Sequence, residues 1–170
     1  MANTNGGGIR VTGMTQGDTR ILLKAGTAAA TVPVTVLNAN AIANGTFDTL
    51  DGWQTNGDVK NDDVSIGTGL YSPPFGNVGT DASVSQHVTH LPAGSTLLLS
   101  ANLMNNGDAK RSIEVACDGQ TVGTLDSKAT TNAWTVTTLE FTSPADNFTL
   151  TLTARGGYMR VDDVSLIIKT

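Results

Sequence analysis

The stretch Asn44-Gly-Thr-Phe-Asp-Thr-Leu-Asp-Gly-Trp53 divides the chain into an arm before it and a β-rich domain after it. Asn44 and Gly45 form a turn signal, because both residues tolerate the positive φ angle that tight turns need. Phe47 and Trp53 flank the polar loop, and each ring removes about 150–250 Å² from water when it is buried. We therefore expect the two rings to close one end of a hydrophobic core; the alternative is a platform on which a sugar ring stacks.

The composition is typical of short strands joined by many turns. Of the 170 residues, 15% are charged, 39% are hydrophobic and 19 are glycine, which favours the all-β class. The net charge is −5 and the basic residues are scattered. The basic patch of a nucleic-acid-binding protein is therefore missing, and we expect no nucleic-acid partner. No apolar run approaches the ~20 residues of a membrane span, so we expect no membrane partner either.

Residues 1–40 are expected to form a strand-containing N-terminal arm. A β-hairpin is predicted from Ile9–Met14 and Thr19–Ala25, joined by the turn Thr15–Asp18. Thr31–Leu37 follows, and its proline demotes it to an edge strand or an extended segment. Another chain is a candidate partner for this segment.

The arm carries more apolar residues than water tolerates and too few for a core of its own. We therefore assign it to assembly and anchoring, with a homo-oligomer, a trimer, as the expected product. Its charge supports a separate role, because residues 1–40 hold three basic residues and one acidic residue, whereas residues 41–170 hold seven and fourteen. The residues chosen for assembly are Ile9, Val11, Ile21, Leu23 and Val34.

Residues 41–170 are expected to fold as one domain of about eight strands. Asp118-Gly119 is the strongest hairpin signal in the chain, and the long loop Gly67–Gly79 is expected to be functional or mobile. Short strands in this number favour a two-sheet sandwich over a closed barrel. The predicted strands are Val59–Ile66, Ala82–His90, Thr96–Met104, Ser112–Cys117, Gln120–Leu125, Trp134–Phe141, Phe148–Ala154 and Tyr158–Ile168.

Four landmarks in this order resemble the jelly-roll carbohydrate-binding modules of families 4, 9 and 22. They are the stretch 44–53, Ser-Val-Ser-Gln-His-Val at 83–88 before Pro-Ala-Gly at 92–94, Trp134 seven residues before Phe141, and Arg-Val-Asp-Asp-Val-Ser-Leu at 160–166. The resemblance covers residues 42–168 and leaves residues 1–40 outside. It implies a two-sheet jelly-roll β-sandwich preceded by the arm, and it is more specific for the fold than for sugar binding.

A structural calcium ion is implied by the same resemblance. Asp162 is expected to share its strand face with Val164 and Leu166, the core face, where a carboxylate needs a partner or a cation. In the resembled modules an acidic residue at this point often holds calcium together with the early turn, which carries the roles over to Asn44, Asp48 and Asp162, with backbone carbonyls completing the shell. The alternative is an Asp162 that accepts hydrogen bonds from backbone amides. No cofactor is otherwise required.

Catalysis is not expected. The chain has two histidines, one cysteine (Cys117) and no serine or cysteine nucleophile motif. A contact site for a glycan or a protein partner is expected at exposed rings, for which Tyr71, Phe75 and Tyr158 are the candidates. Asn77, Gln86 and Asn102 are the candidate polar residues beside them.

Two functions follow from these features. The first is a non-catalytic virion structural protein, a decoration or cement protein that binds the major capsid protein on the outside of a bacteriophage shell. The first residues lack the features of a signal peptide, and release by cell lysis requires none. The alternative is a carbohydrate-binding module of a secreted glycoside hydrolase, with an extracellular location. We expect the first, because a sugar-binding module has no need of the arm.

Overall fold

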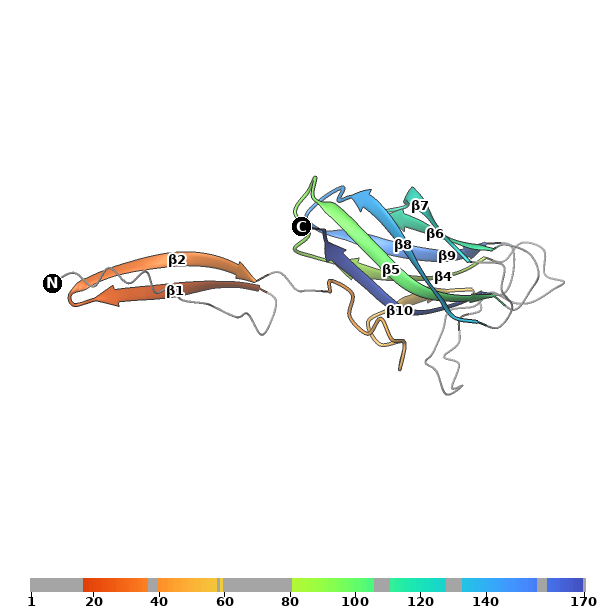
Figure 1. The fold of residues 1–170 in the computed structure, drawn as a ribbon, viewed down its shortest axis with the longest axis horizontal. Helices are drawn as coiled ribbons and strands as arrows, with labels where there is room; N and C mark the ends of the chain where they lie inside the picture. Colours follow the sequence, from red (N-terminus) through yellow and green to blue (C-terminus); the bar gives the residue numbers. More distant parts are fainter. Residues whose placement is uncertain are drawn as a thin grey trace. The chain divides into compact units, whose positions relative to one another are not determined.

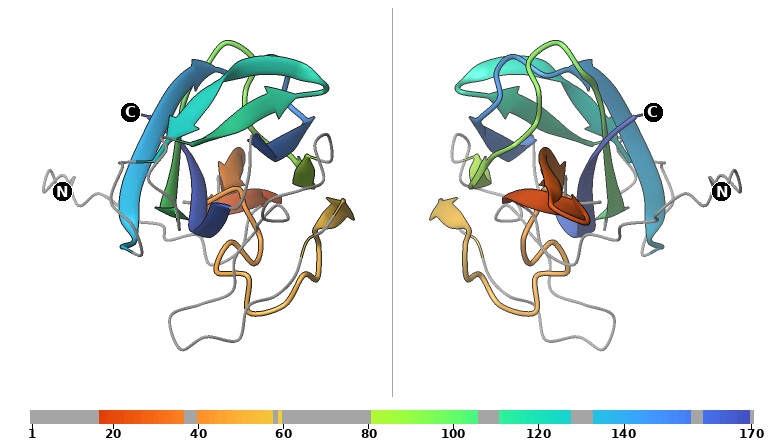
Figure 2. Two further views of the ribbon diagram at one scale, coloured as in Figure 1. Left: turned by 90° about the vertical axis from the view of Figure 1, so that its right-hand side faces the viewer. Right: turned by 90° about the vertical axis from the view of Figure 1, so that its left-hand side faces the viewer.

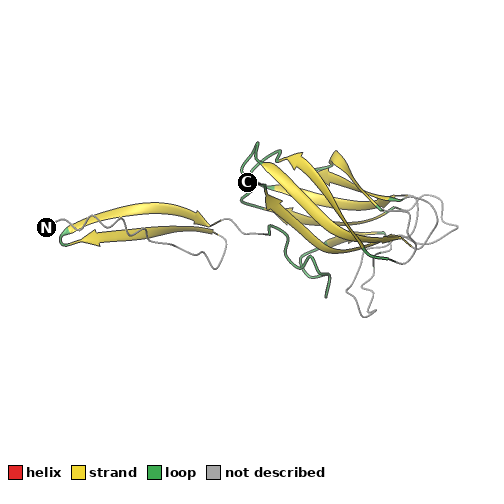
Figure 3. Cartoon of the chain, in the orientation of Figure 1, coloured by secondary structure: helices red, strands yellow, loops and turns green. Residues whose placement is uncertain are grey.

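The computed structural model of the chain describes residues 17–36, 40–57, 59, 81–105, 111–127, 133–155 and 159–169. These residues form strands, turns and loops with no helix among them (Figure 3), which confirms the all-β prediction. It follows that this part of the chain holds no helix of the length and hydrophobicity needed to cross a membrane. The chain divides into two compact units, Met1–Asn38 and Ala39–Thr170.

Ten strands are described, two in the first unit and eight in the second (Figure 1). They are β1 Gly17–Ala25, β2 Ala28–Val36, β3 Gln54–Asn56, β4 Ala82–Val88, β5 Thr96–Asn105, β6 Ser112–Cys117, β7 Gln120–Asp126, β8 Thr135–Thr142, β9 Phe148–Arg155 and β10 Met159–Ile168.

The second unit is a sandwich of two antiparallel sheets. One sheet has the strand order β10-β5-β8 and the other β3-β4-β9-β6-β7, and the two form separate layers in Figure 1. At one side the edge strands β7 and β8 approach each other, as the end-on views of Figure 2 show. The two-sheet sandwich predicted from the spacing of the strands is therefore confirmed.

The core is formed by side chains that alternate along the strands between buried and more exposed positions. In β4 the side chains of Ala82, Val84, Gln86 and Val88 are buried and those between them are less buried or exposed. Every second residue of β5 and β9 is buried in the same way. Full burial of a large aliphatic or aromatic side chain contributes about 1.5–3 kcal/mol. The largest fully buried side chains are Phe47, Leu97, Leu99, Leu103, Ile113, Leu125, Phe148, Leu150, Leu152, Met159 and Leu166.

The hairpin predicted at Asp118-Gly119 is present between β6 and β7. Both residues have positive φ angles, 47° and 79°, as a type I′ turn requires. Val59 is described but the rest of the strand predicted at 59–66, like the loop Gly67–Gly79, lies outside the described residues. The short strand β3 was not predicted; its three residues are exposed and carry no apolar pattern.

The first unit contains a hairpin between β1 and β2, whereas the strand predicted at Ile9–Met14, and with it the predicted pairing, lies outside the described residues. β1 pairs with β2 over nine residues, from Gly17 opposite Val36 to Ala25 opposite Ala28. The turn is therefore Gly26-Thr27, where Gly26 has φ 63°, the first position of a type II′ turn. Gly17 and Asp18, predicted to turn, lie within β1. Another chain was a candidate partner for segment 31–37; within this chain, residues 31–36 belong to β2 and pair with β1.

Candidate functional site

The turn that opens the second unit is held by Asn44. Its Nδ2 atom donates to the carbonyl oxygens of Thr49 (2.6 Å) and Asp51 (3.2 Å), and its own carbonyl accepts from Trp53 Nε1 at 3.0 Å. The rings of Phe47 and Trp53 lie 4.9 Å apart and are both buried. These two rings are therefore core residues and offer no platform for a sugar.

Gln86 ties this turn to the five-stranded sheet. Its Oε1 accepts from the amide of Ala43 at 2.8 Å, and its Nε2 donates to the carbonyl of Ala43 at 2.9 Å and to that of Gly52 at 3.4 Å. Gln86 is buried, so these bonds satisfy an amide that would otherwise be costly to bury. The candidate polar contact Gln86 thus serves the fold.

Asp162 is buried, but not on the predicted face. It pairs with Asn102, whereas Leu166 pairs with Leu99, because a bulge between Asp162 and Ser165 shifts the register of β10. Residues opposite one another share a face, so Asp162 and Leu166 point to opposite sides of the sheet. The expectation that they share the core face was wrong, since strand alternation does not survive a bulge.

The segment 40–45 covers the free edge of β10. Val164 donates its amide to the carbonyl of Gly45 (2.9 Å), and Ala41 donates to the carbonyl of Leu166 (2.8 Å). A Cβ atom at Gly45 would lie 2.1 Å from the Val164 carbonyl oxygen, so the two segments approach closely there. This cover keeps Asp162 at 4% exposure although it faces away from the core.

The carboxylates of Asp163 and Asp48 lie near enough to Asp162 to affect its pKa. The pKa of Asp162 is raised from 3.8 to about 6, by burial first and then by the charges of Asp163 and Asp48, while the Asp163 amide that donates to its Oδ1 opposes the rise. Asp48 also accepts from Thr46 Oγ1 at 2.7 Å, and Asp163 accepts from Asn102 Nδ2 at 2.6 Å. The alternative role for Asp162, acceptor of a backbone amide, is thus seen directly.

The fit of this cluster to calcium is incomplete. Asp48 and Asp162 supply the oxygen ligands that a hard cation takes, but the Asn44 amide bridges Thr49 and Asp51. Within the described ranges, no group of three or more His, Cys, Asp or Glu side chains is placed to hold a metal ion. Calcium binding therefore remains a prediction.

A polar hollow of about 200 Å³ lies on the outer face of the five-stranded sheet. Its wall is formed by Gln54 of β3, Ser85 and His87 of β4, Thr149 of β9, and Gly52 and Gln86 at its rim. Gln54 stands opposite Ser85 and His87 opposite Thr149 in the ladder, so two neighbouring cross-strand pairs line it. The described residues that line it offer amide, hydroxyl and imidazole groups, which suit a neutral ligand rich in hydroxyl groups.

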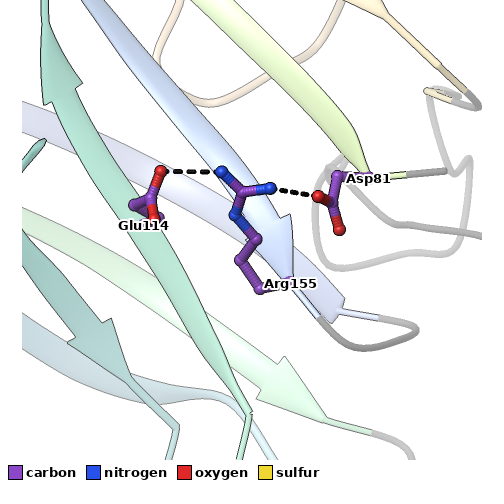
Figure 4. A network of polar contacts seen from close by, with 3 residues as sticks. All are labelled: Asp81, Glu114 and Arg155. Carbon is purple, nitrogen blue, oxygen red and sulfur yellow. Dashed lines mark hydrogen bonds and ion pairs between the residues drawn. The ribbon is translucent and has the colours of Figure 1, made fainter. Parts of the chain in front are cut away.

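The same face continues as an array of hydroxyl side chains. Beyond the polar hollow, Ser83 of β4 stands opposite Thr153 of β9, and Thr151 opposite Ser85. At the far end Arg155 bridges two strands: its Nη2 donates to Glu114 of β6 at 2.9 Å, and its Nη1 donates to Asp81, which precedes β4 (Figure 4). All three side chains are partly exposed, so these ion pairs are worth little individually.

The predicted contact rings Tyr71, Phe75 and Tyr158 lie outside the described residues, as does Asn77. The side-chain amide of Asn102 donates a hydrogen bond to Asp163.

Among the predicted assembly residues, Ile9 and Val11 also lie outside the described residues, Ile21 and Val34 are half-buried, and Leu23 is exposed. Trp134, one of the landmarks of the resemblance, is half-buried, and its Nε1 has no hydrogen-bond partner among the described residues.

Gln86 was a predicted polar contact, but the other residues of the polar hollow were missed. Thr-Leu-Thr-Leu-Thr at 149–153 is a clear alternating pattern. The pairing that places Gln54, Ser85, His87 and Thr149 together requires strand order, which alternation does not provide.

No protein-family model and no curated protein sequence matches the chain. Solved structures do match its fold. The carbohydrate-binding module TmCBM61, in complex with β-1,4-galactotriose, is 18% identical with a TM-score of 0.55, over 78% of this chain and 100% of that one. The CBM22-1–GH10 modules of endo-1,4-β-D-xylanase 10B from Clostridium thermocellum, complexed with xylohexaose, are 17% identical to this chain. The TM-score is 0.56, and the match covers 79% of this chain and 29% of that one.

A third match is the enzymatically active domain of tailspike protein 4 of bacteriophage CBA120, at 19% identity and a TM-score of 0.51, over 77% of this chain and 22% of that one. The chain thus spans less than a third of the tailspike and xylanase structures. At these identities the likeness is one of fold. The second unit is a jelly-roll β-sandwich of the kind found in carbohydrate-binding modules, as predicted.

Proposed function

We propose that Ala39–Thr170 is a non-catalytic carbohydrate-binding module whose ligand occupies the polar hollow. The observation that carries this function is the convergence of Gln54, Ser85, His87 and Thr149 around one hollow on a rigid sheet. Sugar hydroxyls donate and accept hydrogen bonds, and these four side chains offer both. Similar folds in complexes with xylohexaose and β-1,4-galactotriose lend support.

The size of the polar hollow fits the end or one unit of a glycan. Its 200 Å³ lies below the ~300–1,000 Å³ of a pocket that encloses a drug-sized ligand. Every described aromatic side chain is buried or half-buried, so hydrogen bonds from the described residues replace ring stacking. We therefore expect weak affinity for a single site and a preference for neutral sugars over charged ones.

The test is a glycan array followed by calorimetry with the best glycan. His87→Ala and Gln54→Ala should each weaken binding about tenfold, the loss of roughly 1.4 kcal/mol. Thr153→Ala, on the same face but outside the polar hollow, is the matched control and should bind normally. An array without a bound glycan, or affinities that ignore His87 and Gln54, would reject this function.

The second candidate function is a virion structural protein that attaches to a bacteriophage shell. The arm favours it, because the large apolar residues Leu23 and Val32 are exposed on one face of the hairpin, and such residues mark interaction surfaces when they cluster. A similar fold in a bacteriophage tailspike is consistent with a virion location. Purified chain mixed with undecorated shells should co-sediment with them, and deletion of residues 1–38 should abolish this; a shell that binds neither form rejects the candidate.

A further inference from the structure

The hairpin β1–β2 has one apolar face and one mixed face. Opposite residues of an antiparallel ladder share a face, and the pairs Ile21–Val32, Leu23–Ala30 and Ala25–Ala28 fall on the same one. The intervening pairs Arg20–Pro33, Leu22–Thr31 and Lys24–Ala29 form the other. Leu23 and Val32 are each 42% exposed although they belong to the apolar face.

Such a hairpin is too small to be stable by itself. A two-stranded hairpin is marginal in water, and three or more strands with a hydrophobic face are needed for independent stability. Among the described residues, no third strand joins β1 and β2. A further strand along one edge of the hairpin would supply what it lacks.

Pro33 decides which edge of the described hairpin can accept a further strand. It stands within an unbroken ladder opposite Arg20, and since proline has no N–H, its nitrogen must occupy a position that points away from β1. The outer edge of β2 therefore lacks a donor and carries a bulky ring, which blocks the addition of a strand. Hydrogen-bonding direction alternates along an antiparallel pair, so Asp18, Arg20, Leu22 and Lys24 direct their backbone groups to the outer edge of β1. No proline occurs in β1, and that edge is complete.

We propose that β1 pairs antiparallel with β1 of a second copy of this chain, giving a four-stranded sheet in the order β2-β1-β1′-β2′. The two-fold axis passes through Ile21, which then faces Ile21 of the second copy. All nine residues of β1 overlap in this register, and about eight new backbone hydrogen bonds form from the four outward-pointing residues of each copy. Ile21 and Leu23 gain neighbours across the new seam.

Charge selects this register. The register with Ile21 opposite Ile21 places Asp18 opposite Lys24 of the second copy, twice by symmetry, and Arg20 opposite Leu22. A slip by two residues in one direction sets Arg20 opposite Lys24, and in the other it sets Arg20 opposite Arg20. Like charges directly opposite are destabilising. Slips by an odd number would join the apolar face of one copy to the mixed face of the other.

Pairing of two hairpins would also increase the avidity of the sandwich for its ligand. A dimer carries two copies of the polar hollow, and two linked weak sites bind a repeating glycan or a regular surface far more tightly than one. The dimer itself rests on the hairpin alone, and its test is independent of glycan binding.

The experiment measures the mass of the full-length chain in solution by size-exclusion chromatography with light scattering. The wild type should have twice the monomer mass. Leu22→Pro removes an outward donor from the β1 edge and should give a monomer. Thr31→Pro is the matched control, because Thr31 is the cross-strand partner of Leu22 and its nitrogen lies on the already blocked edge of β2; it should remain a dimer.

A charge exchange covers the case in which proline unfolds the hairpin. Asp18→Lys and Lys24→Asp should each weaken the dimer at least tenfold, and the double exchange should restore it. The melting temperature of the sandwich should be the same in every variant. A monomeric or trimeric wild type, a dimeric Leu22→Pro, or a double exchange that fails to rescue would each overturn the proposal.

Discussion

Gln86 forms two hydrogen bonds with the backbone of Ala43, one to its amide and one to its carbonyl, at 2.8 and 2.9 Å across 43 residues of sequence. The Gln86 side chain thus bonds to Ala43 as a paired strand residue would, and it attaches the turn that opens the second unit to β4. Gln86→Leu should lower the free energy of unfolding by about 1–3 kcal/mol, because it leaves backbone groups without partners. Urea denaturation measures this; Thr151→Ala, on the outer face of β9, should stay within about 0.5 kcal/mol. An equal stability of Gln86→Leu and wild type would contradict the role.

Trp53 contributes both packing and a hydrogen bond, which can be separated. Trp53→Ala removes a buried ring in contact with Phe47 and should cost about 3–5 kcal/mol. Trp53→Phe keeps most of the packing and loses the bond from Nε1 to the Asn44 carbonyl, so it should cost about 1–2 kcal/mol. Thermal and urea denaturation of both variants check the order; equal costs would mean that the bond, and not the ring, holds this turn.

The sequence predicted most of the sandwich because its strands alternate. Ser112–Cys117 was predicted to the residue, and Asp118-Gly119 was identified as a turn. The errors arose where a single local feature overrides periodicity. Gly26-Thr27 is a two-residue turn with a weaker signal than the polar stretch before it, and Pro33 is tolerated within β2 because it faces outward.

The candidate site was less predictable than the fold. The bulge after Asp162 places that residue on the opposite face of the sheet from Leu166. The sequence Asp-Asp-Val-Ser has no feature that predicts a bulge. Ser85 and Thr149 are 64 positions apart in sequence and become neighbours only through the pairing of β4 with β9. Patterns within one strand define its faces, but the order of strands, which brings distant residues together, depends on packing across the whole domain.

Gly45 should tolerate no side chain. A Cβ atom there would lie 2.1 Å from the Val164 carbonyl oxygen. The two backbone segments cannot easily move apart, because the Val164 amide donates a hydrogen bond to the Gly45 carbonyl. Gly45→Ala should therefore cost more than about 3 kcal/mol, beyond the usual range for one substitution. Gly119→Ala is the comparison, since a Cβ at Gly119 meets nothing within 4 Å and only its positive φ angle is strained, a cost of about 1–3 kcal/mol. A small effect of Gly45→Ala on the melting temperature would show that segment 40–45 is not fixed to β10.

Asp162 should make the stability of the sandwich depend on pH. Its pKa is raised from 3.8 to about 6, by burial first and then by the charges of Asp163 and Asp48. The folded state therefore retains a proton that the unfolded state loses, and stability falls as pH rises from about 4 to about 6. Two pKa units correspond to at most about 3 kcal/mol. Asp162→Asn should remove this slope and be the more stable form at pH 7, whereas Asp126→Asn, exposed on β7, should keep it.

Calcium would reverse this behaviour, and so the same variants test the predicted ion. A cation bound by Asp162 and Asp48 favours the ionised carboxylates, and a ligand that binds only the folded state stabilises it by mass action. In that case millimolar calcium at pH 7 should raise the melting temperature of the wild type by several degrees, chelation should lower it, and Asp162→Asn should respond to neither. A wild type that ignores both calcium and chelator, while its stability still falls between pH 4 and pH 6, would leave Asp162 as a buried acceptor of the Asp163 amide.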